Sequence, residues 1–189
     1  MRTTALGLLA AVGFTASAQA AELVVKFHEV NEQGTGKQMG TVKFVDTGDD
    51  SLGMFIQPDL TGLSAGGHGF HVHENADCGP KTKDGKVVPG GAAGGHFDPK
   101  NTGRHAGPAG DGHLGDMPEL IAGPEGNTPV AMYAPRLMTT DLVNRAIVVH
   151  KQGDNYFDEP EPLGGGGARV ACGIVEVGAA GRGDASQVR

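Results

Sequence analysis

Six of the eight histidines in this chain stand where their imidazole rings can converge on metal ions. His71 and His73 are two residues apart in the segment 67–74, whose pattern is that of a β-strand. Side chains at that spacing share one face of a strand, so both rings can reach one ion, while Val72 points toward a core. His150 ends another apolar segment. The spacing therefore predicts a histidine-rich metal site built on strands.

A second group of candidate ligands stands in a stretch dominated by turn-forming residues. His96 lies among glycines, and His105, His113 and Asp116 follow within the next twenty residues. Three imidazole nitrogens and one carboxylate form a closed tetrahedral set, which is the pattern of a structural zinc site. Unrelated solvated histidines would not be concentrated so selectively at strand ends and turns.

The two remaining histidines are interpreted differently. His28 falls on the polar face of the first predicted strand and is expected to be solvated. His68 precedes the His71–His73 pair, and we expect it to be a hydrogen-bonding support beside the site rather than a ligand.

Strands, rather than helices, must position these groups. Eight short segments have alternating or wholly apolar patterns and are separated by Gly, Pro, Asp and Asn, whereas no long amphipathic helix stands between them. This predicts an all-β fold, an antiparallel sandwich or barrel, with long functional loops at 75–116 and 152–168 and a short helix at 138–144. The predicted strands are Glu22–Val30, Gly40–Thr47, Ser51–Gln57, Gly67–Glu74, Met117–Ala122, Pro129–Ala134, Arg145–Lys151 and Arg169–Val177.

The first twenty residues have the pattern of a secretory signal peptide. Arg2 supplies a positive charge, residues 5–14 are apolar, and Ala-Gln-Ala at 18–20 is a small-x-small cleavage site. The apolar run is too short to span a bilayer, which takes about 20 residues. An ordinary N-terminal helix is the alternative, but caps and a polar face are missing. We expect cleavage after Ala20, one domain over 21–177 and a flexible tail over 178–189.

Export also bears on the two cysteines and on the partners. Cys78 and Cys172 are an even number in an oxidising compartment, so a disulfide is expected, with two buried free thiols as the alternative. A formal charge of −7 argues against nucleic acid as the main partner. The 33 glycines show no three-residue period, which excludes a collagen-like chain.

Five segments resemble motifs of the copper/zinc superoxide dismutase family, in particular its secreted bacterial branch. The resemblance covers essentially the whole chain from residue 21 to about residue 177, with the motifs in the family's order. The matching segments are GFHVHE at 69–74, GGHFDP at 94–99, GDGHLGD at 110–116, VVHKQGDNY at 148–156 and GGGGARVACGIVE at 164–176.

The resemblance implies an eight-stranded antiparallel Greek-key barrel or sandwich and a dinuclear site that holds one copper ion and one zinc ion per chain. His96 is then shared by the two metals as an imidazolate. The implied copper ligands are His71, His73, His96 and His150, and the implied zinc ligands are His96, His105, His113 and Asp116.

Further roles follow from the same resemblance. Asp154 is expected to link a copper histidine to a zinc histidine, Arg169 to receive the anionic substrate beside the copper, and Cys78 and Cys172 to form the family's disulfide. The implied activity is conversion of two superoxide radicals to dioxygen and hydrogen peroxide, as antioxidant defence in the periplasm. Bulky aromatic residues often pack the dimer interface of bacterial members, and this chain has no Trp. The sequence therefore does not decide between a monomer and a homodimer.

Three other interpretations are weaker. A dinuclear hydrolase would need a carboxylate near the ligands as general base, and we identify none there. The metals of such hydrolases are also usually bridged by carboxylate or water rather than by histidine. A non-catalytic copper- or zinc-binding protein of the same fold would be expected to lack a copper ligand or Arg169, yet none is missing. Gly62-Leu63-Ser64-Ala65-Gly66 matches G-x-S-x-G, but no helix follows, as a nucleophile elbow requires.

Overall fold

The computed structural model describes residues 21–49 and 51–176. The expected signal peptide at 1–20 and the expected tail at 178–189 lie outside the described residues. The described chain is almost entirely β-structure, with a single turn of α-helix and two short 3-10 helices. Its elements are β1 (Glu22–Asn31), β2 (Gly34–Asp46), β3 (Met54–Leu60), β4 (Gly66–His68), β5 (Phe70–His73), β6 (Lys81–Lys83), β7 (Lys86–Val88), η1 (Gly91–Ala93), β8 (Leu120–Ala122), β9 (Met132–Ala134), α1 (Thr139–Leu142), β10 (Arg145–His150), η2 (Pro162–Gly165) and β11 (Arg169–Val175).

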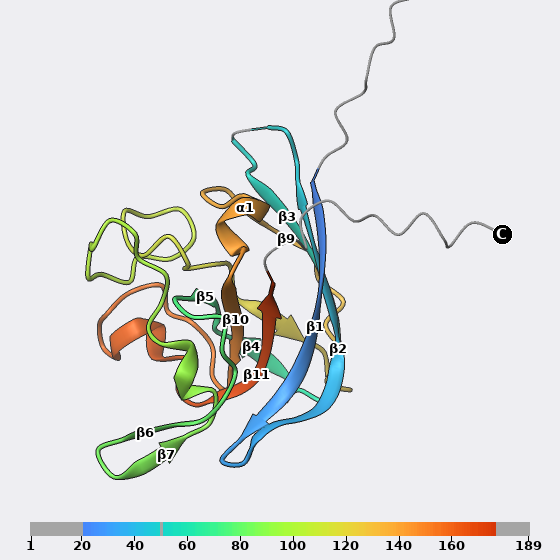
Figure 1. Cartoon of the computed structure of the whole chain (residues 1–189). Coiled ribbons are helices and arrows are strands. Elements are labelled where there is room, and N and C mark those ends of the chain that lie inside the picture. Colours follow the sequence, from blue (N-terminus) through green and yellow to red (C-terminus); the bar gives the residue numbers. More distant parts are fainter. Residues whose placement is uncertain (1–20, 50, 177–189) are drawn as a thin grey trace, which may run out of the picture.

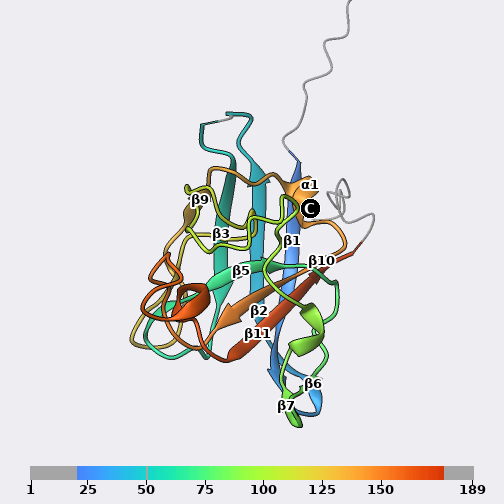
Figure 2. The ribbon, with the colours of Figure 1, turned by 90° about the vertical axis from the view of Figure 1, so that its left-hand side faces the viewer.

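Seven strands form one antiparallel, curled sheet in the order β5-β10-β11-β1-β2-β3-β9. Strands β1, β2 and β3 form one wall, and β5, β10 and β11 cross it as the other (Figures 1 and 2). β4 pairs with β8, and β6 pairs with β7 in a hairpin that projects from the body. None of the helices in the described residues is long and apolar enough to cross a membrane.

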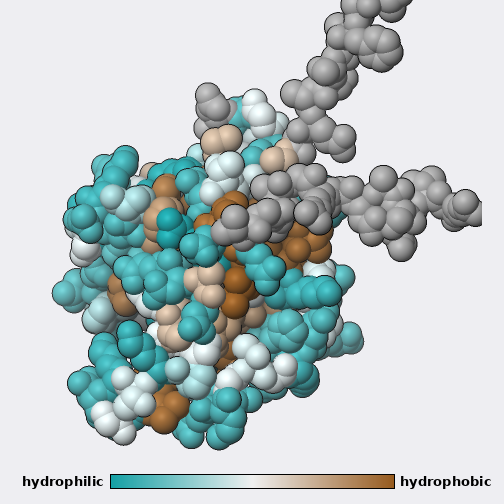
Figure 3. Space-filling model, in the orientation of Figure 1, coloured by the Kyte–Doolittle hydropathy of each residue, from teal (hydrophilic) through white to brown (hydrophobic). Residues whose placement is uncertain are grey.

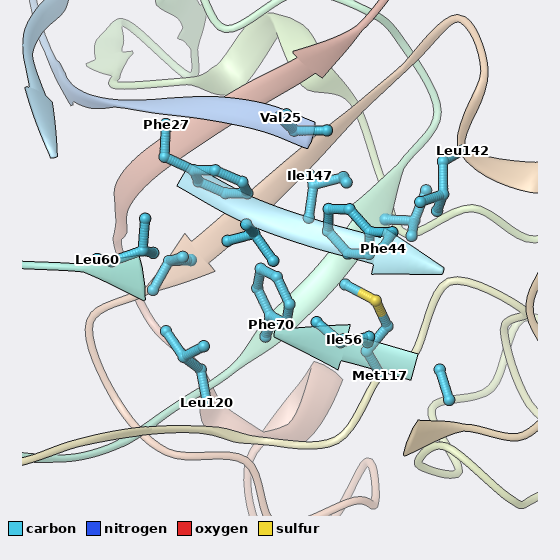
Figure 4. Close-up of a cluster of buried hydrophobic side chains, with 14 of the residues drawn as sticks. Val25, Phe27, Phe44, Ile56, Leu60, Phe70, Met117, Leu120, Leu142 and Ile147 are labelled. Atoms are coloured by element: carbon cyan, nitrogen blue, oxygen red, sulfur yellow. The ribbon is translucent and has the colours of Figure 1, made fainter. Parts of the chain in front are cut away.

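The core lies between the two walls. Phe27, Phe44 and Phe70 are completely buried there, and Ile56 and Ile147 pack among them (Figure 4). β1 shows how the sequence does this, because its residues alternate strictly between buried and exposed from position 22 to position 27. The face of the molecule in Figure 3 is largely hydrophilic, with apolar side chains gathered near its middle and a few elsewhere. The predicted all-β antiparallel fold is confirmed.

The strand boundaries differ from the prediction in several places. The described residues contain eleven strands rather than eight: the 75–116 segment, predicted to lack strands, holds the β6–β7 hairpin, and the predicted strand 67–74 is divided into two. β2 begins at Gly34, six residues early, because it continues the hairpin from β1. β3 does not end before Pro58 but continues through it. Since β9 pairs only with Met54–Ile56, β3 is an edge strand at Pro58, where a missing N–H is tolerated.

The predicted strand 67–74 is split at Gly69. Its first part, β4, pairs with β8, and its second part, β5, pairs with β10. A Cβ atom at residue 69 would lie 2.9 Å from the ring of His71, so glycine is needed where the chain changes partners. The short helix lies inside the predicted 138–144 range, as the single turn α1.

Candidate metal centre

Two adjacent strands carry the first histidines. β5 and β10 pair with His71 opposite Val148 and His73 opposite Ala146 (Figure 1). Val72 points the other way and is completely buried in the core, as predicted. His150, at the end of β10, is held by a bond from its own N–H to the carbonyl oxygen of Gly69 at 2.8 Å.

Four buried histidines converge at this place. Each of them offers a ring nitrogen, and these four nitrogens lie within 4.8 Å of one another. The Nε2 atoms of His73 and His150 are 3.4 Å apart, and the rings of His71 and His96 stack with centroids 4.0 Å apart. The loop brings His96 to the strands through a bridge with His73. The cluster consists of His71, His73, His96 and His150, which we call the four-histidine cluster.

A second cluster adjoins the first through His96. The Nδ1 atom of His96 lies 2.9 Å from Oδ1 of Asp116, while Nδ1 of His105 lies 3.0 Å from Oδ2 and Nδ1 of His113 lies 3.4 Å from Oδ1. All four residues are buried. The second group of ligand atoms that lie within 4.8 Å of one another is formed by His71, His96, His105 and Asp116. His113 lies outside that group, with its ring centroid 5.4 Å from that of His96 and 6.1 Å from that of His105. We call these four residues, His96, His105, His113 and Asp116, the zinc-loop cluster.

The polar atoms that lack partners show that these clusters fit metal ions. The Nδ1 atoms of His71, His105 and His113 are buried without a hydrogen-bond partner, although two of them lie near Asp116. Buried polar nitrogens are rarely left unpaired unless an ion or another ligand satisfies them. A set rich in imidazole suits copper, and three nitrogens with one carboxylate suit zinc.

The ring nitrogens on the outer side are bonded to the protein. Nδ1 of His73 lies 3.0 Å from the carbonyl oxygen of Gly94, and Nδ1 of His150 lies 3.2 Å from that of Gly167. Such bonds fix which nitrogen carries the proton and how the ring is turned. In both residues Nε2 is left to face the interior of the cluster.

Asp154 connects the two clusters from outside. Its Oδ2 accepts a bond from Nε2 of His71 at 2.7 Å, and its Oδ1 accepts one from Nε2 of His105 at 2.8 Å. The backbone N–H of Tyr156 also donates to Oδ1, and the N–H of Asp154 donates to Glu119. One carboxylate therefore orients one ring in each cluster.

Arg169 begins β11 and is half-buried, with its guanidinium held by two backbone carbonyls. Nη1 donates to Gly90 and Nη2 donates to Gly94. The segment that carries these carbonyls is fastened to β11 by the Cys78–Cys172 disulfide, which confirms the expected pairing. The same backbone stretch thus supports Arg169 and, through Gly94, also His73.

Burial keeps the four-histidine cluster neutral in the metal-free chain. Loss of hydration and the neighbouring histidines lower the pKa of His96 to about 3, and they lower the pKa values of His73 and His150 well below the usual range. Neutral imidazole is the form that ligates metals. His105 behaves oppositely: burial opposes protonation, but the adjacent carboxylates of Asp116 and Asp154 outweigh it and raise the pKa of His105 to about 9.

The structure thus brings six of the seven residues that the sequence analysis proposed as ligands into two groups of mutually close ligand atoms, with His113 just outside them, and it places Asp154 and Arg169 beside them. His68 is the predicted support: Nδ1 lies 2.6 Å from the carbonyl oxygen of His150, and Nε2 lies 2.9 Å from that of Ser64. His28 lies apart from the clusters, on the outer side of β1.

Sequence reasoning missed several groups that position the site. The side chain of Asp158 accepts a bond from the N–H of His105 at 2.9 Å, and Arg136 bonds four carbonyls of the loop that carries His113. Arg136 stands more than twenty residues beyond that loop, in a segment with no metal-ligand pattern. Nothing in the local sequence signals this contact, because only the fold brings the two segments together.

Comparison with known proteins agrees with this geometry. The family model described as copper/zinc superoxide dismutase matches residues 38–175. A protein of Escherichia coli K12 named "Superoxide dismutase [Cu-Zn]" is 46% identical over 177 residues, covering 93% of this chain and 100% of that protein.

Two solved structures are also similar to this chain. The copper/zinc superoxide dismutase of Brucella abortus is 48% identical, with a TM-score of 0.79 over 82% of this chain and 99% of that one. The monomeric copper, zinc superoxide dismutase of Salmonella enterica is 46% identical, with a TM-score of 0.72 over 82% of this chain and 99% of that one.

Proposed function

Because this chain belongs to the copper/zinc superoxide dismutase family, it is an oxidoreductase acting on superoxide, and we propose that its two side-chain clusters divide the work between one copper ion and one zinc ion. Two superoxide radicals and two protons give one dioxygen and one hydrogen peroxide. The observation that carries the assignment is the pair of adjoining clusters, joined by His96, with unpaired buried nitrogens among their members.

We assign the copper site to His71, His73, His96 and His150, and the zinc site to His96, His105, His113 and Asp116. When bound, copper supplies one-electron redox chemistry, and zinc, which has none, supplies a fixed charge and a structural anchor. The nitrogen-only set and the mixed nitrogen and carboxylate set support this division.

The chain's own residues bind and orient the substrate. Arg169 always carries a positive charge and offers a planar fork of donors, of which two are already fixed on Gly90 and Gly94. Its remaining N–H groups are the groups we assign to the superoxide anion. His96 has Nδ1 directed at Asp116, which leaves Nε2 for the four-histidine cluster and for holding a proton there.

A non-catalytic metal-binding protein of this fold is not favoured. Such a protein would be expected to have lost a copper ligand or the anion-binding arginine. This chain has all four histidines close together, and it has Arg169 bonded to the carbonyl oxygen of Gly90.

The test combines metal content with turnover on purified protein. Wild-type protein is expected to bind one copper and one zinc per chain and to consume superoxide. His150→Ala is expected to lose copper-dependent turnover while keeping most of its zinc. His28→Ala, on the outer side of β1, is the matched control and should behave as wild type. Normal turnover in His150→Ala would overturn the copper assignment.

We also propose that the chain is exported to the periplasm and cleaved after Ala20. The support is the charged, apolar and small-x-small order of residues 1–20, together with a disulfide, which is typical of oxidising compartments. Mass spectrometry of protein released from cells by osmotic shock should show a mature chain that begins at Ala21. An intact Met1 in the folded, disulfide-bonded protein would contradict this.

A homodimer of this chain stays a prediction. The exposed apolar side chains of the described residues lie on several strands, and the solved Salmonella relative is described as monomeric. Sedimentation equilibrium at micromolar concentration decides between the two states, since a single species at monomer mass would exclude the dimer. The exposed side chains include Val24, Ile121, Tyr133 and Ile174.

A further inference from the structure

Arg136 lies outside both metal clusters, yet it makes more hydrogen bonds to the loop that carries His113 than to any other part of the described chain. Nε donates to the carbonyl oxygen of Pro108 at 3.0 Å, and Nη1 donates to that of Gly112 at 3.2 Å. Nη2 donates to the carbonyl oxygens of Gly107 at 3.1 Å and His113 at 2.6 Å. The last of these carbonyls belongs to a proposed zinc ligand.

The segment 107–113 needs such a partner, because it cannot order itself by burying apolar surface. Its residues are Gly, Pro, Ala, Gly, Asp, Gly and His. Ordering a residue costs about 1–2 kcal/mol of backbone entropy, and buried carbonyl groups must be hydrogen-bonded. Gly107 and Gly112 are buried, and a Cβ atom at residue 112 would lie 2.4 Å from the carbonyl oxygen of Arg104. The glycines permit a tight loop whose carbonyls turn inward toward one guanidinium.

Arg136 is itself fixed from the side of the core. Leu137, the next residue, is buried in the main core, and its N–H donates to the carbonyl oxygen of Ala134 in β9. Two residues later, the N–H and hydroxyl of Thr139 both donate to Asp46 of β2, at 2.7 and 2.6 Å. The backbone that carries Arg136 is therefore held by β2 and β9, whether or not the zinc loop is ordered.

We propose that Arg136 is a positioning residue for the zinc site, which holds the loop 107–113 in its ligand-presenting shape before any metal binds. This rests on the proposed function, because it assumes that His113 ligates zinc. The guanidinium makes the four carbonyl bonds at once because its donors form a rigid fork, whereas the ammonium of lysine is a compact point charge. The ion then meets a loop that is already ordered, and less of the binding free energy is spent on ordering it.

The test compares Arg136→Gln and Arg136→Lys with Arg104→Gln as the matched control. Arg104 lies in the same loop region, and its replacement by glutamine removes the same charge. Its side chain is exposed and donates a single bond, to the carbonyl oxygen of Asp111 at 3.2 Å. Zinc affinity is measured on the folded, metal-free full-length protein by competition with a chelator. We expect Arg136→Gln to lose about tenfold or more, Arg136→Lys to recover only part of it, and Arg104→Gln to stay close to wild type.

Hydrogen exchange of the metal-free proteins provides the second measurement. The amide of His113, bonded to the carbonyl oxygen of Arg104 at 2.9 Å, is expected to be protected in the wild type and to lose that protection in Arg136→Gln. Amides of β10 should exchange alike in both, which shows that the variant is folded. Cobalt(II) in place of zinc should show an altered visible absorption spectrum in the same variant, which a merely structural role would not produce.

Two results would overturn the proposal. One is an unprotected His113 amide in the metal-free wild type, since the loop would then be ordered only by the ion. The other is a zinc affinity and cobalt spectrum in Arg136→Gln equal to those of the wild type. Failure of the proposed function is distinguishable, because then the wild type itself would bind neither zinc nor cobalt in the loop.

Discussion

At the scale of single residues, Asp154 makes several of the hydrogen bonds that hold the site together. In our assignment it binds neither the substrate nor a metal ion. Asp154 receives imidazole N–H groups from both clusters, and burial of the carboxylate is outweighed by the bonds from His105 and His71, which hold its pKa well below the usual range. It therefore stays charged at any physiological pH. Both histidines depend on it for ring orientation.

Asp154→Asn is expected to weaken zinc binding about tenfold or more. An amide offers one oxygen to one imidazole N–H, and its NH2 group faces the other N–H without an acceptor, so one ring must turn. Zinc affinity measured by chelator competition checks this. Asp59→Asn, an exposed carboxylate on β3, is the control and should leave the affinity unchanged. Equal affinities in the two variants would mean that Asp154 orients neither ring.

At the scale of elements, the disulfide fastens a loop to the sheet. It joins Cys172 of β11 to Cys78, which are 94 residues apart in the sequence, and both lie in a second small apolar cluster. That cluster also holds Ala93, one residue before the carbonyl of Gly94 that supports Arg169 and His73. The bridge is thus part of the support for the substrate-binding side of the site.

Replacing both cysteines with alanine is expected to lower the free energy of unfolding by about 4.7 kcal/mol, the chain-entropy value for a loop of this length. Chemical denaturation of the metal-loaded proteins measures it. Turnover should also fall, because the carbonyls that hold Arg169 are no longer tied to β11. Unchanged stability in the double variant would show that the native loop is held by its other contacts alone.

At the scale of the whole molecule, the buried histidines make stability of the metal-free protein depend on pH in two directions. His96 keeps its neutral form down to a pKa of about 3, while the unfolded chain takes up a proton near the ordinary histidine pKa of about 6.5. Stability is therefore lost as the pH falls through this window, and His73 and His150 add to the loss. His105, with a pKa raised to about 9, contributes stability that is lost between pH 6.5 and 9.

Calorimetry of the metal-free protein should accordingly give the highest melting temperature between about pH 6 and 7.5, with a decline on either side. Metal-loaded protein should lack the alkaline decline, because an ion that occupies His105 replaces the proton. A melting temperature that does not change between pH 4 and 6.5 in the metal-free protein would contradict the neutral state of the buried cluster.

The charge of the molecule leads to a second prediction at this scale. The chain carries a net −7, so an anionic substrate must be drawn by local positive charge, from Arg169 and from the lysines of the β6–β7 hairpin. Turnover is expected to fall as salt rises, since exposed charges are screened within about 8–10 Å near physiological ionic strength. Rates measured from low to high salt check this, and a flat profile would exclude steering. Those lysines, Lys81, Lys83 and Lys86, are all exposed.

The antiparallel β-fold and most of the candidate metal ligands could be predicted from the sequence. Alternation in β1 placed its apolar residues in the core, and the spacing of His71 and His73 put both rings on one face, because both patterns depend only on the geometry of a strand. The ligand types and the family motifs predicted a dinuclear centre for the same reason: they are local.

The remaining features depend on residues far apart in the chain and could be found only in the folded structure. The change of partners at Gly69, the passage of β3 through Pro58 and the hairpin inside a long loop all follow from which strand lies next to which. Arg136 is the clearest case, since its four acceptors are carbonyl oxygens more than twenty residues away. Backbone carbonyls have no residue identity, so no sequence pattern can mark them as partners, and only folding brings them to the guanidinium.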